Sequence, residues 1–391
     1  MSALSRAQLA DGLETEVLRF LETERARANA PGIAAAIAVS GRMVFTGGVG
    51  YAEIENRVPM DGGSVLNVGS VSKVMAVLGL MKLWEEGRIA WSDPLQKHLP
   101  WLPAGNAPGE SSPTPITLEH ILTHSSGYRH YLDDAEKEFG PKRFKALVHY
   151  DSIREAAEIF MNDPLLFRPG AHYSYSSYAS NLIQAVGEAV ASQPYEEFLR
   201  AHVFRPAGML TAAFDVKGRV VANRGRGYRF DSKTGAWRDG HTEDVSYKYT
   251  GGGMIASVED LVRMGVALNH GRILKRETVD ELYRVRFKVV SGRAASSGEK
   301  SVYAAPGGNP DELEERELDQ ALILYGSRDP FGRRWLGHSG GVQGTSTYFL
   351  NYPDENVVVA VRANGGDFDS LACVQTLAQL VLPPGRPGRD P

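Results

Sequence analysis

Sheet-forming and helix-forming stretches are distributed unevenly along this 391-residue chain, and this distribution limits its fold more than any other feature. The runs GIAAAIAV and MVFTGGVGYAEI lie near the start, and TSTYFLNYP and ENVVVAVRANGG lie near the end. Between Trp101 and His241 the pattern is mostly helix and loop. We therefore expect an α/β (α+β) fold: a discontinuous α/β lobe of residues 1–100 and 245–391, and a mostly helical lobe of residues 101–244.

Local signals indicate several elements more closely. Apolar residues at helical spacing between Leu9 and Leu21 predict a first helix that ends before Pro31. A hairpin is expected at Ser40-Gly41-Arg42, because glycine tolerates the left-handed backbone of a tight turn. The two late runs read as antiparallel strands. Residues 291–319 are polar and rich in Gly, Ser and Glu, which predicts a mobile insertion.

Composition narrows the classes of partner. The net charge is −4, with no long run of either sign, so we expect no binding of nucleic acid and none of membranes. No stretch approaches 18 apolar residues, and the first thirty residues mix charges without an apolar core, which favours a cytoplasmic location. The single cysteine, Cys373, stands in an apolar stretch and reads as a packed core residue.

A Ser-x-x-Lys motif, Ser70-Val71-Ser72-Lys73, begins a strongly apolar helical segment. A spacing of three places both side chains on one face of a helix. A serine hydroxyl needs a neighbouring base to become a nucleophile, and a lysine can act as that base if burial or nearby positive charge lowers its pKa. The motif alone is weak evidence for catalysis, because Ser297-Gly298-Glu299-Lys300 repeats it in the polar insertion. The alternative is that Ser70 only begins a helix and that Lys73 is solvated.

Motifs along the whole chain resemble one family, the serine β-lactamases, DD-peptidases and family VIII esterases. The Ser70 segment resembles its nucleophile helix, RPGAHYSYSS its Tyr-x-Asn segment, and GHSGGVQGTSTYFL its Lys-Thr-Gly strand. Among subgroups, GYRHY, NDPLLFRPG and SYKYTGGG are most similar to the mitochondrial-type serine β-lactamase-like proteins. The resemblance implies the β-lactamase/transpeptidase-like fold, an antiparallel sheet flanked by helices plus an all-helical lobe, with Ser70 between the lobes.

The same resemblance implies a division of labour among site residues. Ser70 would be acylated, Lys73 and Tyr175 would take its proton, and Tyr175 would activate the deacylating water. The backbone N–H groups of Ser70 and Gly341 would form the oxyanion hole, and no metal or cofactor is implied. The further residues expected to contact substrate are His338, Ser339, Gly340, Ser177, His130 and Tyr131; for His130 and Tyr131 a plain surface loop is the alternative.

Two positions depart from the family pattern. Ser177 stands where β-lactamases have the Asn of Tyr-x-Asn, and a hydroxyl offers fewer hydrogen bonds than an amide. His338 stands where they have the Lys of Lys-Thr-Gly, and a histidine would be a weaker, pH-dependent anchor for a carboxylate. Both changes lower the expectation of efficient β-lactam hydrolysis.

Three other motifs match known functional patterns, but we expect none of them to have the function that the pattern suggests. Lys233-Thr234-Gly235 is expected to be a hairpin turn. Gly337-His338-Ser339-Gly340-Gly341 fits the nucleophile elbow of α/β-hydrolases, but a strand follows it rather than a helix. His120 and His124 lie four residues apart without a third ligand, so we expect packing or capping roles rather than a metal site.

Three functions remain open from the sequence. The first is a serine hydrolase of small-molecule esters, with amides as further substrates. The second is a peptidase or D-aminopeptidase, or a weak β-lactamase. The third differs in kind: a scaffolding protein that assembles into homo-oligomers or filaments and retains vestigial chemistry. Ser70, Lys73 and Tyr175 together favour an enzyme, since a scaffold has no physical need for all three.

Overall fold

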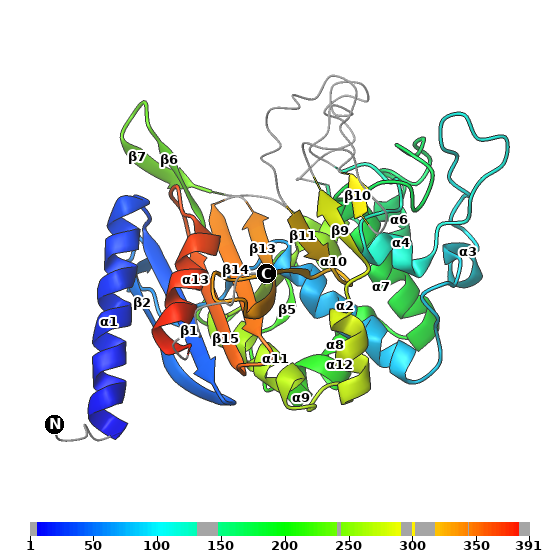
Figure 1. The fold of residues 1–391 in the computed structure, drawn as a ribbon. Helices are drawn as coiled ribbons and strands as arrows, with labels where there is room; N and C mark the ends of the chain where they lie inside the picture. Colours follow the sequence, from blue (N-terminus) through cyan, green and yellow to red (C-terminus); the bar gives the residue numbers. More distant parts are fainter. Residues whose placement is uncertain are drawn as a thin grey trace.

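A ten-stranded sheet with helices on both faces forms the centre of the molecule (Figure 1). The computed structural model describes residues 6–130, 148–240, 244–290, 299–301, 317–342 and 344–382. The helices are α1 (Arg6–Arg27), α2 (Val71–Glu85), α3 (Leu95–His98), α4 (Leu118–Leu122), α6 (Ile153–Ala157), α7 (Ser177–Ala191), α8 (Tyr195–Leu199), η1 (Arg200–Phe204), α9 (Arg205–Ala207), η2 (Val245–Lys248), α10 (Tyr249–Gly252), α11 (Val258–Asn269), α12 (Arg276–Tyr283) and α13 (Ser370–Val381).

The strands of the large sheet come from both halves of the sequence. They are β1 (Gly32–Val39), β2 (Arg42–Glu53), β3 (Val58–Pro59), β9 (Phe287–Val290), β10 (Glu299–Ser301), β11 (Glu317–Gln320), β12 (Tyr325–Arg328), β13 (Arg334–Val342), β14 (Thr345–Tyr352) and β15 (Val357–Ala363). Their order is β10-β9-β11-β12-β13-β14-β15-β1-β2-β3, and β10 pairs with β9 in parallel while the other pairs are antiparallel. Strand β1 therefore lies between the C-terminal β15 and its own hairpin partner β2. The predicted mixed fold with a mainly antiparallel sheet is confirmed.

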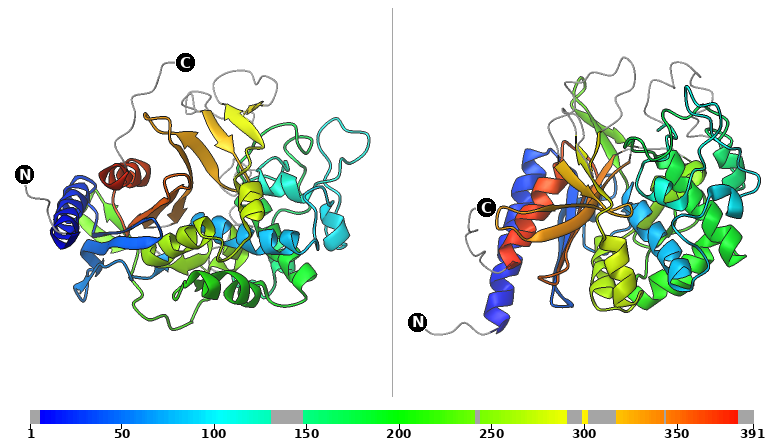
Figure 2. Two further views of the ribbon diagram at one scale, coloured as in Figure 1. Left: turned by 60° about the horizontal axis from the view of Figure 1, so that its bottom comes forward. Right: turned by 45° about the vertical axis from the view of Figure 1, so that its right-hand side comes forward.

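The alternation of side chains along β1 explains why both faces of the sheet are covered. Ile33, Ala35 and Ile37 face a core shared with α1 and α13. Ala34 and Ala36 face the larger core, which includes α2, α7 and α11. Side chains alternate between the faces of a strand, so an uninterrupted apolar strand must be buried on both sides. Figure 2 shows α1 and α13 on one side of the sheet and the remaining helices on the other.

Two local predictions near the N-terminus are confirmed. The β1–β2 hairpin turns at Ser40 and Gly41, whose φ angles of 49° and 79° are both left-handed. Helix α2 runs through the protein interior, and its residues from Val71 to Met81 are all buried. A helix that is apolar on every side must be surrounded by other elements. Gly87, with φ 71°, follows the end of α2, where a left-handed residue stops a helix.

Other expectations are only partly matched. Lys233-Thr234-Gly235 lies in the turn between β6 (Tyr228–Asp231) and β7 (Ala236–Asp239), as predicted. Within the segment expected to lack sheet, however, β5 (Ala213–Phe214) pairs with β8 (Met254–Ala256), which also pairs with β4 (Leu66–Asn67). These strands are too short to show a period-two pattern. The boundaries of the two lobes stay predictions.

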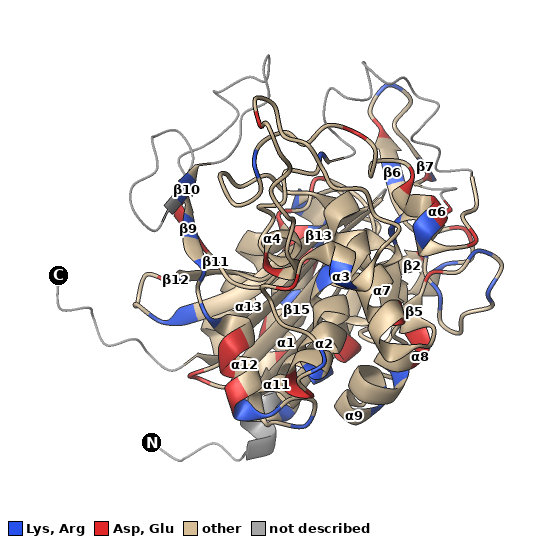
Figure 3. Ribbon diagram, turned by 90° about the vertical axis from the view of Figure 1, so that its right-hand side faces the viewer, with Lys and Arg blue, Asp and Glu red and all other residues tan. Residues whose placement is uncertain are grey.

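The polar segment 291–319 lies largely outside the described residues. Its described parts are two strands of the large sheet, β10 and the start of β11, so these residues pair regularly. Cys373 is buried on α13 in the core, as predicted. Figure 3 shows basic and acidic residues interspersed along the ribbon rather than gathered by sign. Of the helices the structure describes, none has the length and apolarity needed to cross a membrane.

Candidate active site

A sharp turn between β4 and α2 presents Ser70 at the N-terminus of the buried helix α2. Gly69 has φ 53°, a left-handed conformation that favours glycine, and its N–H donates to the side chain of Asn67 at 2.7 Å. Ser72 closes the turn: its hydroxyl donates to Gly69 O at 2.6 Å and accepts from Met254 N at 3.0 Å. Ser70 is thereby the half-buried end of a rigid element.

Lys73 lies one turn further along α2 and is fully buried. Its Nζ lies 3.0 Å from Ser70 Oγ and 3.0 Å from Ser177 Oγ, and it also donates to the carbonyl of Gly251. All three partners are uncharged. Burial, and second the positive charge of Lys248, hold the pKa of Lys73 well below its ordinary value. A neutral lysine amine has a lone pair and can accept the serine proton.

Tyr175 contacts both Ser70 and Lys73. Its hydroxyl donates to Ser70 Oγ at 2.7 Å, and its ring lies 4.7 Å from Lys73 Nζ. Histidines hold the ring: the centroid of His124 is 4.4 Å away in a tilted arrangement, and that of His130 is 5.3 Å away, edge-on. The structure thus brings Tyr175, which is distant in sequence, into contact with the Ser70-x-x-Lys73 motif.

His338 lies behind Tyr175 on β13 and has only 1% of its surface exposed. Its Nδ1 is 2.5 Å from Ser339 O, and its ring lies tilted against that of Tyr325, with 4.8 Å between the ring centroids. Burial first, and then the charge of Lys73, lower the pKa of His338 to about 3. A ring that is buried and neutral at physiological pH carries no charge toward a ligand. The substrate contact expected of His338 stays a prediction.

The strand β13 lies directly against the start of α2. A Cβ added to Gly340 would come within 2.0 Å of Val68 O and 3.2 Å of Ser70 N, and one added to Gly69 within 2.7 Å of Gly341 N. The backbone nitrogens of Ser70 and Gly341 therefore meet at one place. An oxyanion hole needs two N–H groups that point to one place, so this closeness is compatible with the role expected of Ser70 and Gly341, which stays a prediction. Ser339 and Gly341 are exposed here, whereas Gly340 is buried at the contact.

The other residues expected to contact substrate differ in how far they are buried. Ser177 is fully buried, and its described contact is with Lys73 Nζ, so its hydroxyl orients the lysine. His130 is half-buried, its Nδ1 accepts from Ser177 N at 3.2 Å, and burial lowers its pKa to about 3. Its ring packs on Tyr175, which is more than a plain surface loop would provide. Tyr131 lies outside the described residues.

The sequence did not predict that the backbone of α10 contacts Lys73, nor that Asn181 holds this backbone in place. Asn181 on α7 accepts from Gly251 N at 3.1 Å and donates to Tyr247 O at 2.6 Å, which fixes α10 against α7. Thr250 adds a hydrogen bond to Ser180 O at 3.0 Å. The Gly251 carbonyl then faces Lys73 Nζ. Only the glycine run GGG marked this segment in the sequence, and it did not indicate a lysine contact.

The pair His120 and His124 has capping and packing roles, as predicted. Nδ1 of His120 accepts from Thr117 N in a capping box at the start of α4, and His124 packs on Tyr175. Burial lowers the pKa of both, that of His120 to about 4. In the described part of the chain, no three His, Cys, Asp or Glu side chains gather in a group able to hold a metal ion.

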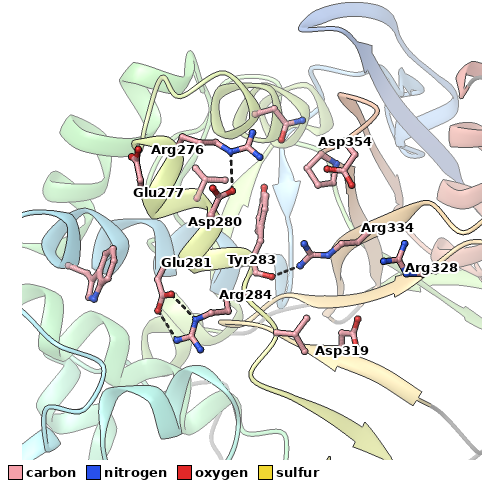
Figure 4. Close-up of a pocket in the computed structure, with 15 residues that line it drawn as sticks. Arg276, Glu277, Asp280, Glu281, Tyr283, Arg284, Asp319, Arg328, Arg334 and Asp354 are labelled. Atoms are coloured by element: carbon pink, nitrogen blue, oxygen red, sulfur yellow. Dashed lines mark hydrogen bonds and ion pairs between the residues drawn. The ribbon is translucent and has the colours of Figure 1, made fainter. Parts of the chain in front are cut away.

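A pocket of about 730 Å³ opens elsewhere, between α12 and the end of β12 (Figure 4). Its charges pair with one another: Arg276 with Asp280, and Arg284 with Glu281. Arg334 donates to the carbonyl of Tyr283. None of the residues around Ser70 lines this pocket, and its balanced charges indicate no particular ligand.

The chain is similar to known proteins over most of its length. A relative at 26% identity is the mitochondrial serine beta-lactamase-like protein LACTB of Homo sapiens, over 83% of this chain and 69% of that one. D-aminopeptidase of Gluconobacter oxydans is 24% identical over 93% of this chain and 62% of its own length.

Solved structures share the fold at lower identity. The octameric penicillin-binding protein homologue from Pyrococcus abyssi superposes with a TM-score of 0.74 at 22% identity, over 94% of this chain and 77% of that chain. EstCE1, described as a hydrolase with promiscuous acyltransferase activity, gives 0.73 at 20% identity, over 95% and 99%. The model of the family described as Beta-lactamase matches residues 17–381, almost the whole chain. The protein therefore belongs to the β-lactamase family of serine hydrolases.

Proposed function

We propose that this protein is an esterase that hydrolyses small esters, with short acyl groups preferred, through an acyl-enzyme on Ser70. The observation that carries the proposal is the double contact of one hydroxyl. Ser70 Oγ lies 3.0 Å from the amine of Lys73 and 2.7 Å from the phenol of Tyr175. A half-exposed serine between a buried amine and a phenol is set up for nucleophilic attack.

The reaction would proceed in two steps. Ser70 Oγ attacks the ester carbonyl while its proton passes to the neutral amine of Lys73, and the N–H groups of Ser70 and Gly341 hold the oxyanion. The C–O bond to the alcohol breaks, and the alcohol leaves with a proton that Tyr175 donates as it takes the one held by Lys73. In the second step Tyr175 takes a proton from water while its own phenol proton passes to the amine of Lys73, and the hydroxide attacks the acyl carbon. The bond to Ser70 Oγ then breaks, and Lys73 returns the proton to Ser70.

Esters are favoured over β-lactams by the absence of a charge at His338 on β13. The family pattern has a lysine at this position, whereas the buried His338 carries no charge at neutral pH. A substrate carboxylate would find no cation at His338, whereas an uncharged ester needs none. The Ser177 hydroxyl points to Lys73, which removes a further polar contact for an amide side chain.

A second candidate is hydrolysis of amides with a D-amino-acid end group. The support comes from relatives: D-aminopeptidase is similar over 93% of this chain, and the D-amino acid amidase from Ochrobactrum anthropi shares the fold. Assembly into homo-oligomers is supported by the octameric Pyrococcus abyssi homologue. A scaffold without catalysis is disfavoured, since it gives no reason to bury a lysine against a serine.

The test compares the wild-type protein with Ser70→Ala on p-nitrophenyl butyrate, nitrocefin and a D-alanyl p-nitroanilide. Ser297→Ala is the matched control, because it removes the serine of the second Ser-x-x-Lys. We expect Ser70→Ala to lower kcat/KM for the butyrate ester by about 10³-fold or more, and Ser297→Ala to leave it unchanged. Intact mass should show an acyl adduct on the wild type alone.

The substrates rank the candidates. Faster turnover of the ester than of the anilide or the lactam supports the esterase. A higher kcat/KM for the D-alanyl anilide would replace it with the amidase. Equal ester hydrolysis by wild type and Ser70→Ala, without an adduct, would remove Ser70 from the chemistry, and elution of such a protein in the void volume of a sizing column would point to a scaffold.

A further inference from the structure

Lys248 is a second lysine beside the nucleophile, and the proposed reaction assigns it no role. It is the last residue of η2 and caps the N-terminus of α10, the element whose Gly251 carbonyl accepts from Lys73. Only 5% of Lys248 is exposed. A long cationic side chain is seldom buried without a function or a partner that requires it.

The path of the Lys248 side chain leads toward Ser70. Its Cδ lies 3.9 Å from the position that a Cβ on Gly252 would occupy, and that same position is 3.7 Å from the carbonyl carbon of Gly69. Its Nζ lies 5.1 Å from the ring centroid of Tyr247. Lys248 therefore extends alongside the turn that presents Ser70, on the α10 side.

The absence of side chains at residues 251–253 makes this approach possible. Gly251 and Gly252 form the end of α10, and Gly253 follows. A Cβ on Gly251 would come within 2.6 Å of Ser177 O, so the segment packs closely on α7. The glycine run thus brings the backbone and Lys248 close to Lys73, while Asn181 fixes the segment in place.

The groups that face Lys73 differ in charge. From α7 and α10 it meets the uncharged oxygens of Ser177 and Gly251. The three histidines nearby, His124, His130 and His338, have pKa values lowered by burial and are neutral at physiological pH. Tyr175 adds the face of its ring. Lys248 adds a positive charge that acts on Lys73 without a described contact between the two side chains.

We propose that Lys248 is a positioning residue for the reaction: its ammonium group keeps Lys73 in the neutral, proton-accepting form and so supplies a charge that His338 does not. This inference rests on the proposed Ser70 chemistry. A like charge beside a buried amine disfavours protonation of that amine, and the effect reaches the reaction without contact between Lys248 and the substrate. Burial of Lys73 acts in the same direction.

The test is the pH dependence of kcat/KM for p-nitrophenyl butyrate. The proteins are the wild type, the neutral variants Lys248→Gln and Lys248→Met, and the charge-retaining variant Lys248→Arg. Removal of the charge lets Lys73 bind a proton more readily, so the acidic limb should move to higher pH. We expect a loss on the order of tenfold on that limb in both neutral variants, with recovery toward the wild-type rate at alkaline pH. The arginine variant should keep the wild-type limb.

Lys233→Gln is the matched control, because it neutralises an exposed lysine in the distant β6–β7 turn. The pH dependence of Ser70 labelling by a fluorophosphonate gives a second reading, since the Ser70 Oγ–P bond forms as fluoride leaves and the serine proton passes to Lys73. Circular dichroism melting shows whether each variant is folded. Labelling and hydrolysis should show the same displaced limb.

Two results would overturn the role of Lys248 alone. One is an acidic limb that stays in place in a folded neutral variant while Ser70→Ala is inactive. The other is an equal loss at every pH, which indicates a structural part only. Full activity of Ser70→Ala would instead overturn the proposed function, and the role of Lys248 with it.

Discussion

At the scale of single residues, Tyr175 shows how burial and aromatic packing prepare one hydroxyl. His124 and His130 hold the ring from two directions, and its phenol reaches Ser70. Because burial keeps both histidines neutral, they fix the position of the ring without adding a competing charge. The phenol and the amine of Lys73 are then the groups able to exchange a proton with Ser70.

Removal of that phenol tests its part directly. Tyr175→Phe keeps the ring and its contacts, so we expect kcat for the butyrate ester to fall by about 10²- to 10⁴-fold while the melting temperature changes little. Steady-state kinetics and circular dichroism measure the two effects. Tyr173→Phe is the control, because that hydroxyl bonds Tyr325 rather than Ser70. Comparable losses from both substitutions would deny Tyr175 a specific role.

At the scale of elements, the contact between β13 and the start of α2 determines whether the site exists. Gly340 has no room for a side chain, since a Cβ would collide with the backbone oxygen of Val68 at 2.0 Å. Its neighbour Gly341 has nothing within 4 Å of the same position. The strand therefore needs glycine at one of two adjacent positions for packing.

This difference gives a paired prediction. Gly340→Ala should lower the free energy of unfolding by about 2 kcal/mol or more, because a rigid backbone contact must open. Gly341→Ala should change it by less than about 1 kcal/mol. Urea denaturation followed by circular dichroism measures both. Equal free energies of unfolding for the two variants would contradict the prediction, because they would show that β13 can move at this contact without loss of stability.

How much could be foreseen depended on the sequence distance of the interactions. Ser40-Gly41 marked its own hairpin, and the apolar run after Ser70 marked a buried helix, because neighbouring residues determine both. Tyr175 was found through resemblance to a family. The clamp of Asn181 on Gly251 and the approach of Lys248 could not be foreseen, since they join elements that no periodicity relates. The burial of His338 is likewise a property of the packed fold.

At the scale of the whole molecule, several histidines are buried in the neutral form. The pKa values of His338 and His130 are lowered to about 3, and that of His120 to about 4. The unfolded chain has ordinary histidines that bind protons near pH 6.5. As the pH falls below that value, the unfolded state takes up protons before the folded state does, so stability is lost.

We therefore expect the free energy of unfolding to decrease as the pH falls from 7 to 5. Each such histidine contributes at most about 1.4 kcal/mol per pH unit below 6.5. His338→Gln should make the dependence shallower, whereas His270→Gln, at an exposed position, should not. Urea unfolding at a series of pH values measures this. An unchanged slope in His338→Gln would contradict the neutral buried ring.

The place of β1 between β2 and β15 has a consequence for how the protein is made. Ile33 pairs with Ala363, so the ribosome must synthesise the chain as far as β15 before this strand finds its second neighbour. Until then the nascent chain exposes an apolar strand edge of the kind that recruits chaperones or aggregates. Gly341 also emerges long after Ser70. The proposed site is therefore incomplete until β13 has been made, and we expect Ser70 to be inert during translation up to that point.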